Sequence, residues 1–168
     1  MIDSPRCTVI GLGSPLMGDD GVGLVALERL REEFDLPAGV ELVDGGTWGM
    51  SLLPMIEDAQ HLLFIDAINT GAVPGSVIVL QRDQIPRYLE MKVSPHQVDL
   101  RDVLAVAELR GTLPKQTIAV GLQPARVEMF VGLSPTLEHG LDGLVATAVR
   151  QLEAWGITCR PRPEAICA

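Results

Sequence analysis

Three aspartates and one histidine are the residues of this sequence whose types and spacing best suit chemistry. Asp20 follows a glycine-rich segment, Asp44 and Asp66 each end a short apolar run, and His96 lies in a Ser-Pro-His-Gln loop. Carboxylates and one imidazole form a hard-to-borderline ligand set, which suits nickel, zinc or a similar ion with open coordination positions. Carboxylates also serve as general bases.

Each of these residues also has an ordinary structural interpretation. Asp19 suits a helix cap that complements the helix dipole, which leaves its neighbour Asp20 as the functional candidate. Asp44 precedes two glycines and serves equally well in a turn. Asp66 is harder to explain structurally, because an apolar strand delivers it toward the interior, where an unpaired carboxylate is costly. His96 gains interest only by joining the aspartates.

Short apolar runs that alternate with helical patterns are the elements that must position these side chains. Such alternation is typical of βαβ units and a mostly parallel sheet. The runs predict strands at 8–12, 40–43, 61–65, 75–80 and 117–122, with an edge piece at 128–131. Apolar spacing predicts helices at 21–34, 51–58, 100–109 and 135–155. Because ligands bind outside the carboxyl ends of parallel strands, the three aspartates are expected at one edge of the sheet.

The composition indicates one soluble, folded domain. The 168 residues are 47% hydrophobic, with mean hydropathy +0.27, so a full core is available and bulk disorder is excluded. The formal net charge of −9 disfavours nucleic acid and anionic lipid as partners. We find no secretory signal and no apolar run of the roughly 20 residues that span a bilayer. We expect a cytoplasmic monomer with a single domain over residues 1–168, in which 157–168 form a loose tail.

Common catalytic and binding templates do not match. The glycine-rich segment 11–23 begins like a dinucleotide-binding loop, but Leu16 replaces the third glycine and two carboxylates stand where a phosphate would meet the helix. A small-molecule-binding domain that uses this loop remains an alternative. The sequence contains no HExxH and no GxSxG motif. Three cysteines lack CxxC spacing, and we assign them no chemistry: Cys7, Cys159 and Cys167.

Five segments occur in an order and at spacings that extend over nearly the whole chain. They are GLGSPLMGDDGVG, VELVDGGTWGM, LLFIDAI with PGSVIVL, KVSPHQVDL and VGLSPTLE. Together they resemble the hydrogenase maturation endopeptidases, which trim the large-subunit precursor of nickel–iron hydrogenases. The resemblance implies an α/β fold, with a twisted, mostly parallel five-stranded sheet flanked by helices on both faces.

The resemblance also implies a set of site residues. Asp20, Asp66 and His96 match the family's nickel-recognition site, and Asp44 matches an auxiliary acidic position near it. We therefore expect Asp20, Asp44 and Asp66 as catalytic residues. The ion is nickel that the substrate precursor supplies, with zinc or cadmium as a surrogate.

The implied activity is an endopeptidase that removes the C-terminal extension of the nickel-loaded precursor. Two mechanisms remain open. In the first, the ion assists attack by water while Asp44 or Asp20 acts as general base. In the second, Asp44 and Asp66 share a proton and nickel serves only for recognition. A non-catalytic nickel-binding maturation chaperone for the same precursor is the alternative function.

Overall fold

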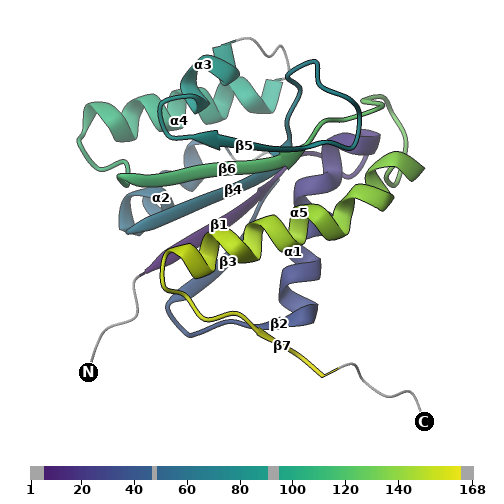
Figure 1. Cartoon of the computed structure of the whole chain (residues 1–168). Helices are drawn as coiled ribbons and strands as arrows, with labels where there is room; N and C mark the ends of the chain where they lie inside the picture. The colour runs from purple at the N-terminus through teal and green to yellow at the C-terminus, as the bar shows by residue number, and fades with distance from the viewer. Residues whose placement is uncertain (1–5, 47–48, 91–94, 164–168) are drawn as a thin grey trace.

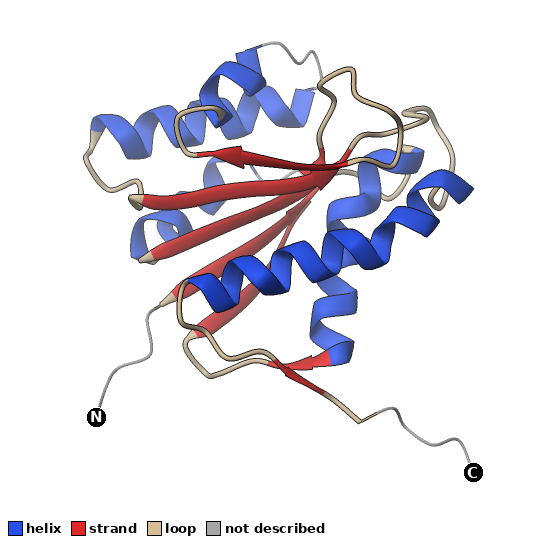
Figure 2. Ribbon diagram, in the orientation of Figure 1, coloured by secondary structure: helices blue, strands red, loops and turns tan. Residues whose placement is uncertain are grey.

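A five-stranded sheet lies at the centre of the molecule, in the order β3-β1-β4-β6-β5 (Figures 1 and 2). This structure is a computed structural model that describes residues 6–46, 49–90 and 95–163, and only the backbone of 89–90 and 95–99. The strands are β1 (Cys7–Leu12), β3 (Val40–Gly46), β4 (His61–Ala67), β5 (Val77–Gln81) and β6 (Gln116–Leu122). All pairings are parallel except that of β5 with β6. The expected mostly parallel sheet is confirmed.

Helices cover both faces of the sheet, as expected (Figure 2). One face packs against α1 (Val22–Glu33) and α5 (Pro135–Ala154). The other packs against α2 (Leu53–Asp58), α3 (Ile85–Glu90) and α4 (Pro95–Leu109). Two 3-10 turns precede helices on these faces, η1 (Gly18–Gly21) before α1 and η2 (Gly49–Leu52) before α2. Among the described residues, none of the helices has the length and hydrophobicity that crossing a membrane requires.

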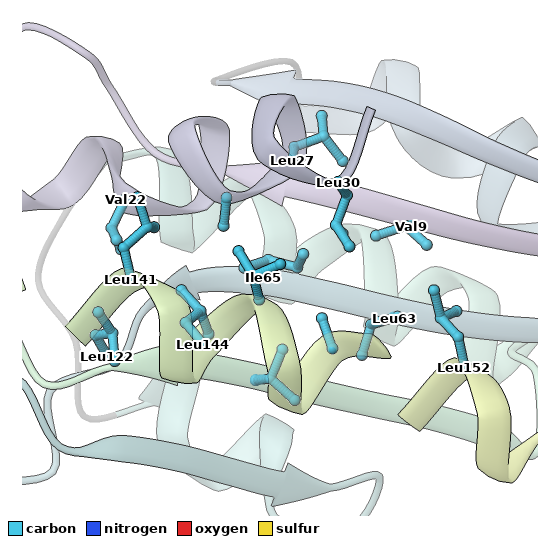
Figure 3. Packing of buried hydrophobic residues seen from close by; sticks show 14 of the residues in the cluster. Val9, Val22, Leu27, Leu30, Leu63, Ile65, Leu122, Leu141, Leu144 and Leu152 are labelled. Atoms are coloured by element: carbon cyan, nitrogen blue, oxygen red, sulfur yellow. The ribbon is translucent and has the colours of Figure 1, made fainter. Parts of the chain in front are cut away.

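Strand β4 is buried on both faces, which explains its continuous apolar run. Leu63 and Ile65 enter the core under α1 and α5 (Figure 3). Leu62 and Phe64 alternate with them into the second core, under α2 to α4. Each such side chain contributes about 1.5–3 kcal/mol on burial. Because side chains alternate along a strand, the next residue after Ile65, Asp66, points to the α3 and α4 face.

Strand and helix boundaries largely follow the prediction, and three of the differences lie near the predicted site or its loops. The predicted loop around His96 is the first turn of α4, which begins at Pro95 rather than at residue 100. The predicted edge piece at 128–131 forms no strand and makes one isolated bridge, Met17 to Phe130. The short helix α3 has no counterpart in the prediction.

The segment predicted as a loose tail is instead packed as far as residue 163. Ile157 and Cys159 are buried in the core with α1 and α5. Strand β7 (Arg160–Pro161) then pairs antiparallel with β2 (Phe34–Asp35). The rest of the predicted tail, 164–168, lies outside the described residues. The apolar Ile157 fixes the start of this segment, while backbone pairing holds its polar end.

Candidate active site

Asp66 lies at the carboxyl edge of the sheet, as the last residue but one of strand β4. Its register partner is Gly121 on β6, and only 4% of its surface is exposed. The Asp66 Oδ1 accepts a hydrogen bond from the Ala67 backbone N–H at 2.8 Å. The side chain lines a small pocket with Tyr88 and Leu100 from α3 and α4. The expectation that an apolar strand buries this carboxylate is confirmed.

Tyr88 holds the chain immediately after Asp66. Its hydroxyl donates to the Ala67 carbonyl at 3.2 Å and accepts from the Asn69 N–H at 3.1 Å. Tyr88 is the only tyrosine of the chain, and it lies on the helix that the sequence did not predict. The sequence analysis missed this residue, because a single aromatic without a recognised element around it carries no positional signal.

A second side chain that the sequence analysis missed fixes the loop beyond Asn69. The Gln123 Oε1 accepts from the backbone N–H groups of Thr70 at 2.8 Å and Ala72 at 3.1 Å. The Gln123 Nε2 donates to Asn69 Oδ1 at 2.9 Å. This buried amide follows β6, so the carboxyl ends of β4 and β6 are tied together beside Asp66.

Asp20 lies in η1, the turn that leads into α1, and is also 4% exposed. Its Oδ2 accepts from the Ser14 backbone N–H at 2.9 Å. Gly13 has φ +111°, and a Cβ there would lie 1.8 Å from the Asp20 carbonyl oxygen. The loop after β1 therefore folds tightly over η1, which needs glycine at this position.

The neighbouring carboxylate, Asp19, has a different role from the helix cap that the sequence predicted. Its oxygens accept four hydrogen bonds from the loop before α5. The donors are the N–H groups of Ala125 (2.9 Å), Arg126 (2.8 Å) and Ser134 (2.7 Å) and the Ser134 hydroxyl (2.9 Å). Ser134 in turn caps α5 by accepting from the Leu137 N–H, as predicted. Asp19 is thus a buried structural anchor.

Gly23 brings the elements of Asp20 and Asp66 together. A Cβ at Gly23 would lie 2.1 Å from the Ile65 carbonyl oxygen and 2.5 Å from that of Leu12. The first turn of α1 therefore rests directly on the backbone that precedes Asp66. Because η1 runs into α1, this close approach places Asp20 at the same carboxyl edge of the sheet as Asp66.

Asp44 lies on the edge strand β3 and is exposed. Its register partner is Gly11, whose other neighbour is Ile65. Val43 packs into the core under α2 to α4, and a Cβ at Gly45 would meet Ile10 on that side. Strand alternation therefore directs Asp44 to the α1 and α5 face, opposite to Asp66, with β1 between them.

The backbone of His96 lies in the first turn of α4, and its side chain is outside the described residues. Its expected place beside Asp20 and Asp66 stays a prediction. Among the described side chains, which do not include His96, no three His, Cys, Asp or Glu residues gather as a metal cluster.

The described cysteines behave as buried apolar residues. Burial, followed by the nearby Cys159, raises the pKa of the Cys7 thiol to about 12. Burial also raises the pKa of Cys159, with Glu153 as a smaller cause. A protonated thiol is a poor nucleophile and a poor metal ligand. Neither cysteine is a candidate for the chemistry of the site.

Comparison with known families decides the class of protein. The family model described as "Hydrogenase maturation protease" matches residues 25–151. The chain belongs to the hydrogenase maturation protease family. This assignment confirms the expected enzyme class, a peptidase.

Individual relatives of this maturation protease agree along most of their length. This chain is 40% identical over 154 residues to "Hydrogenase expression/formation protein HupD" of Rhodobacter capsulatus, and the match covers 90% of this chain and 73% of the relative. It is 36% identical to "Hydrogenase 2 maturation protease" of Escherichia coli, covering 94% and 96%. The solved structure of the hydrogenase maturating endopeptidase HybD from E. coli superimposes with a TM-score of 0.90 at 35% identity, covering 94% and 98%.

Proposed function

We propose that this maturation protease removes the C-terminal extension of the large-subunit precursor of a nickel–iron hydrogenase, after nickel has been inserted. The observation that carries the proposal is the pair of buried carboxylates, Asp20 and Asp66, on two elements that Gly23 packs together at one edge of the sheet. The names of the relatives, a maturation protease for hydrogenase 2 and a maturating endopeptidase, support the substrate class.

The donor chemistry supports nickel as part of the substrate. Two carboxylates and the imidazole of His96 form a small ligand set of hard-to-borderline character. Such a set suits an ion that the thiolates of a precursor already hold and that still has open positions. An empty precursor brings no ion for these donors to bind, so the metal-ligand contribution to its binding is missing. The loaded precursor is therefore bound in preference to the empty one. Zn²⁺ or Cd²⁺ serves as a surrogate probe of the same donors.

For cleavage we favour attack by water that the nickel of the substrate assists, by polarising the scissile carbonyl or lowering the pKa of the water. Asp20 or Asp66 then accepts the proton as general base. A proton-sharing pair requires carboxyl groups about 3 Å apart. Asp44 and Asp66 point to opposite faces of the sheet with β1 between them, which disfavours that pair. We assign Asp44 to the exposed rim of the site.

The test compares nickel-loaded and nickel-free precursor, with the C-terminal mass of the precursor as the readout. The precursor comes from the nickel–iron hydrogenase of the same genome. Wild-type protein is expected to shorten only the loaded form. Asp20→Asn, Asp66→Asn and His96→Gln are each expected to slow cleavage at least about a hundredfold.

Asp58→Asn is the matched control, since Asp58 is an exposed aspartate at the end of α2, at the opposite edge of the sheet. It is expected to cleave at the wild-type rate. Equal cleavage of loaded and empty precursor would contradict nickel recognition. A stable complex in which the mass of the precursor never changes would contradict the peptidase and indicate a chaperone.

A further inference from the structure

Exposed apolar side chains gather on two loops next to the candidate active site. Eleven large hydrophobic residues are exposed in the described part of the chain, and five of them lie on these loops. The five, which we call the apolar platform, are Leu16 (61% exposed), Val127 (52%), Met129 (88%), Phe130 (46%) and Val131 (75%). Scattered apolar residues on a surface are ordinary, whereas a cluster of this kind marks a contact site.

Backbone hydrogen bonds hold the apolar platform in one shape. The Phe130 N–H donates to the Leu16 carbonyl at 3.1 Å, and the Gly18 N–H donates to the Phe130 carbonyl at 2.7 Å. The Asp19 N–H donates to the Arg126 carbonyl at 3.1 Å, and the Asp19 carboxylate fixes both ends of the loop. A surface that is already ordered loses little conformational entropy on binding, which favours association.

The apolar platform is continuous with the site and carries no net charge. Leu16 lies in the loop between β1 and η1, the turn that contains Asp20, and Figure 1 shows the loop between β6 and α5 beside the start of α1. Arg126 lies over the Phe130 ring at 4.7 Å and pairs with Glu128 at 3.0 Å, so the two charges cancel. In a chain of net charge −9 this neutral area fits an apolar partner rather than a cationic one.

We propose that the apolar platform docks an apolar surface of the hydrogenase large-subunit precursor, beside the segment that carries the scissile bond. This inference rests on the proposed function. Methionine and phenylalanine are enriched as interface anchors, and a few such residues supply most of the binding energy. Contacts on the apolar platform lie away from the reacting atoms, so they bind the substrate and the transition state alike. They lower KM and leave kcat unchanged.

The double variant Met129→Ser/Val131→Ser tests the docking surface, because these two side chains are the most exposed of the five. Leu109→Ser is the matched control, since Leu109 is 89% exposed at the far end of α4. We expect the double variant to raise KM for nickel-loaded precursor about tenfold or more, with kcat within about twofold of wild type. The control is expected to match wild type in both constants. Met129→Lys is a second probe with the same expected direction.

Binding to nickel-free precursor separates this inference from the proposed function. Under the proposed function the empty precursor is not cleaved, and it has no nickel for the carboxylates and His96 to bind. Its dissociation constant from the enzyme therefore measures the contribution of the apolar platform. We expect the double variant to raise that constant about tenfold. An unchanged constant and an unchanged KM would overturn the docking surface while cleavage by wild type upholds the function. If the wild-type enzyme without precursor sediments as a dimer and the double variant as a monomer, the platform binds a second copy of the chain, and the inference is also overturned.

Discussion

Replacing Gly23 by alanine is the substitution whose effect the structure specifies best. The added Cβ would lie 2.1 Å from the Ile65 carbonyl oxygen and 2.5 Å from that of Leu12, both backbone atoms of buried strands. Ordinary contact begins near 3.4 Å. Helix α1 must therefore move away from the sheet by about 1 Å, because neither β1 nor β4 has room to give way.

The expected loss of stability combines two opposing effects. Overpacking against backbone costs roughly 3 kcal/mol or more. Removing a glycine from a helix returns about 0.5–1 kcal/mol. We expect Gly23→Ala to lower the free energy of unfolding by about 2–4 kcal/mol. Gly143→Ala is the matched control on α5, where the nearest atom to an added Cβ is Val77 Cγ2 at an ordinary 3.5 Å. It is expected to raise stability by about 0.5–1 kcal/mol.

Urea unfolding followed by circular dichroism measures both changes, as shifts in midpoint at an unchanged slope. Asp20 lies in η1, which runs directly into the displaced helix α1, and an error of about 1 Å in catalytic geometry costs about a hundredfold in rate. Folded Gly23→Ala protein, assayed in the cold, should therefore cleave precursor at least about tenfold more slowly than Gly143→Ala. A Gly23→Ala midpoint equal to that of wild type would refute the argument that this contact sets the spacing of Asp20 and Asp66.

Three further substitutions test single side chains. Asp19→Asn puts an amide donor among four N–H and O–H donors, and should lower the free energy of unfolding by about 2–3 kcal/mol in thermal melts. Cys7 keeps its proton in the folded state up to a pKa of about 12, so stability falls as pH rises above about 9, by up to about 1.4 kcal/mol per pH unit. Cys7→Ala should flatten that decline between pH 9 and 10.5, and an equal slope would contradict it. Burial lowers the pKa of His61 in the folded state. The neutral ring is therefore fully stabilising above pH 6.5, and this stability is lost as the pH falls and the unfolded chain takes up the proton first. The melting temperature of His61→Gln should depend less on pH between 7.5 and 5 than that of wild type.

The fold was predictable because two patterns in the chain are clear, the short apolar runs of the strands and the helical spacing of apolar residues between them. Residues 62–65 form a continuous apolar run, which is typical of a strand with both faces covered, and the structure covers both faces of β4. Burial of Asp66 follows from the same run. Ser134-Pro135 marks the start of α5 because a side-chain cap and a proline at the first turn are local signals.

The misplaced elements depend on contacts that are distant in the sequence. Packing of 157–163 requires β7 to meet β2 more than a hundred residues earlier, and no local pattern encodes that pairing. Asp19 looked like a helix cap because its partners lie 106 to 115 residues away, on the loop before α5. The sequence predicted a structural role for Asp19, and the structure gives it one. The predicted reason, a helix cap, is wrong, because Asp19 binds the loop before α5 instead.

The adjacent aspartates show how one short turn can serve both the fold and the site. Asp19 accepts four hydrogen bonds from the loop that carries the apolar platform, whereas the Asp20 Oδ2 accepts from the Ser14 N–H in the loop after β1. The anchor and the candidate ligand are consecutive residues of one 3-10 turn. Because Asp19 and Asp20 are consecutive, losing the hydrogen bonds of Asp19 should also displace Asp20, so the Asp19→Asn variant is expected to lose cleavage rate as well as stability.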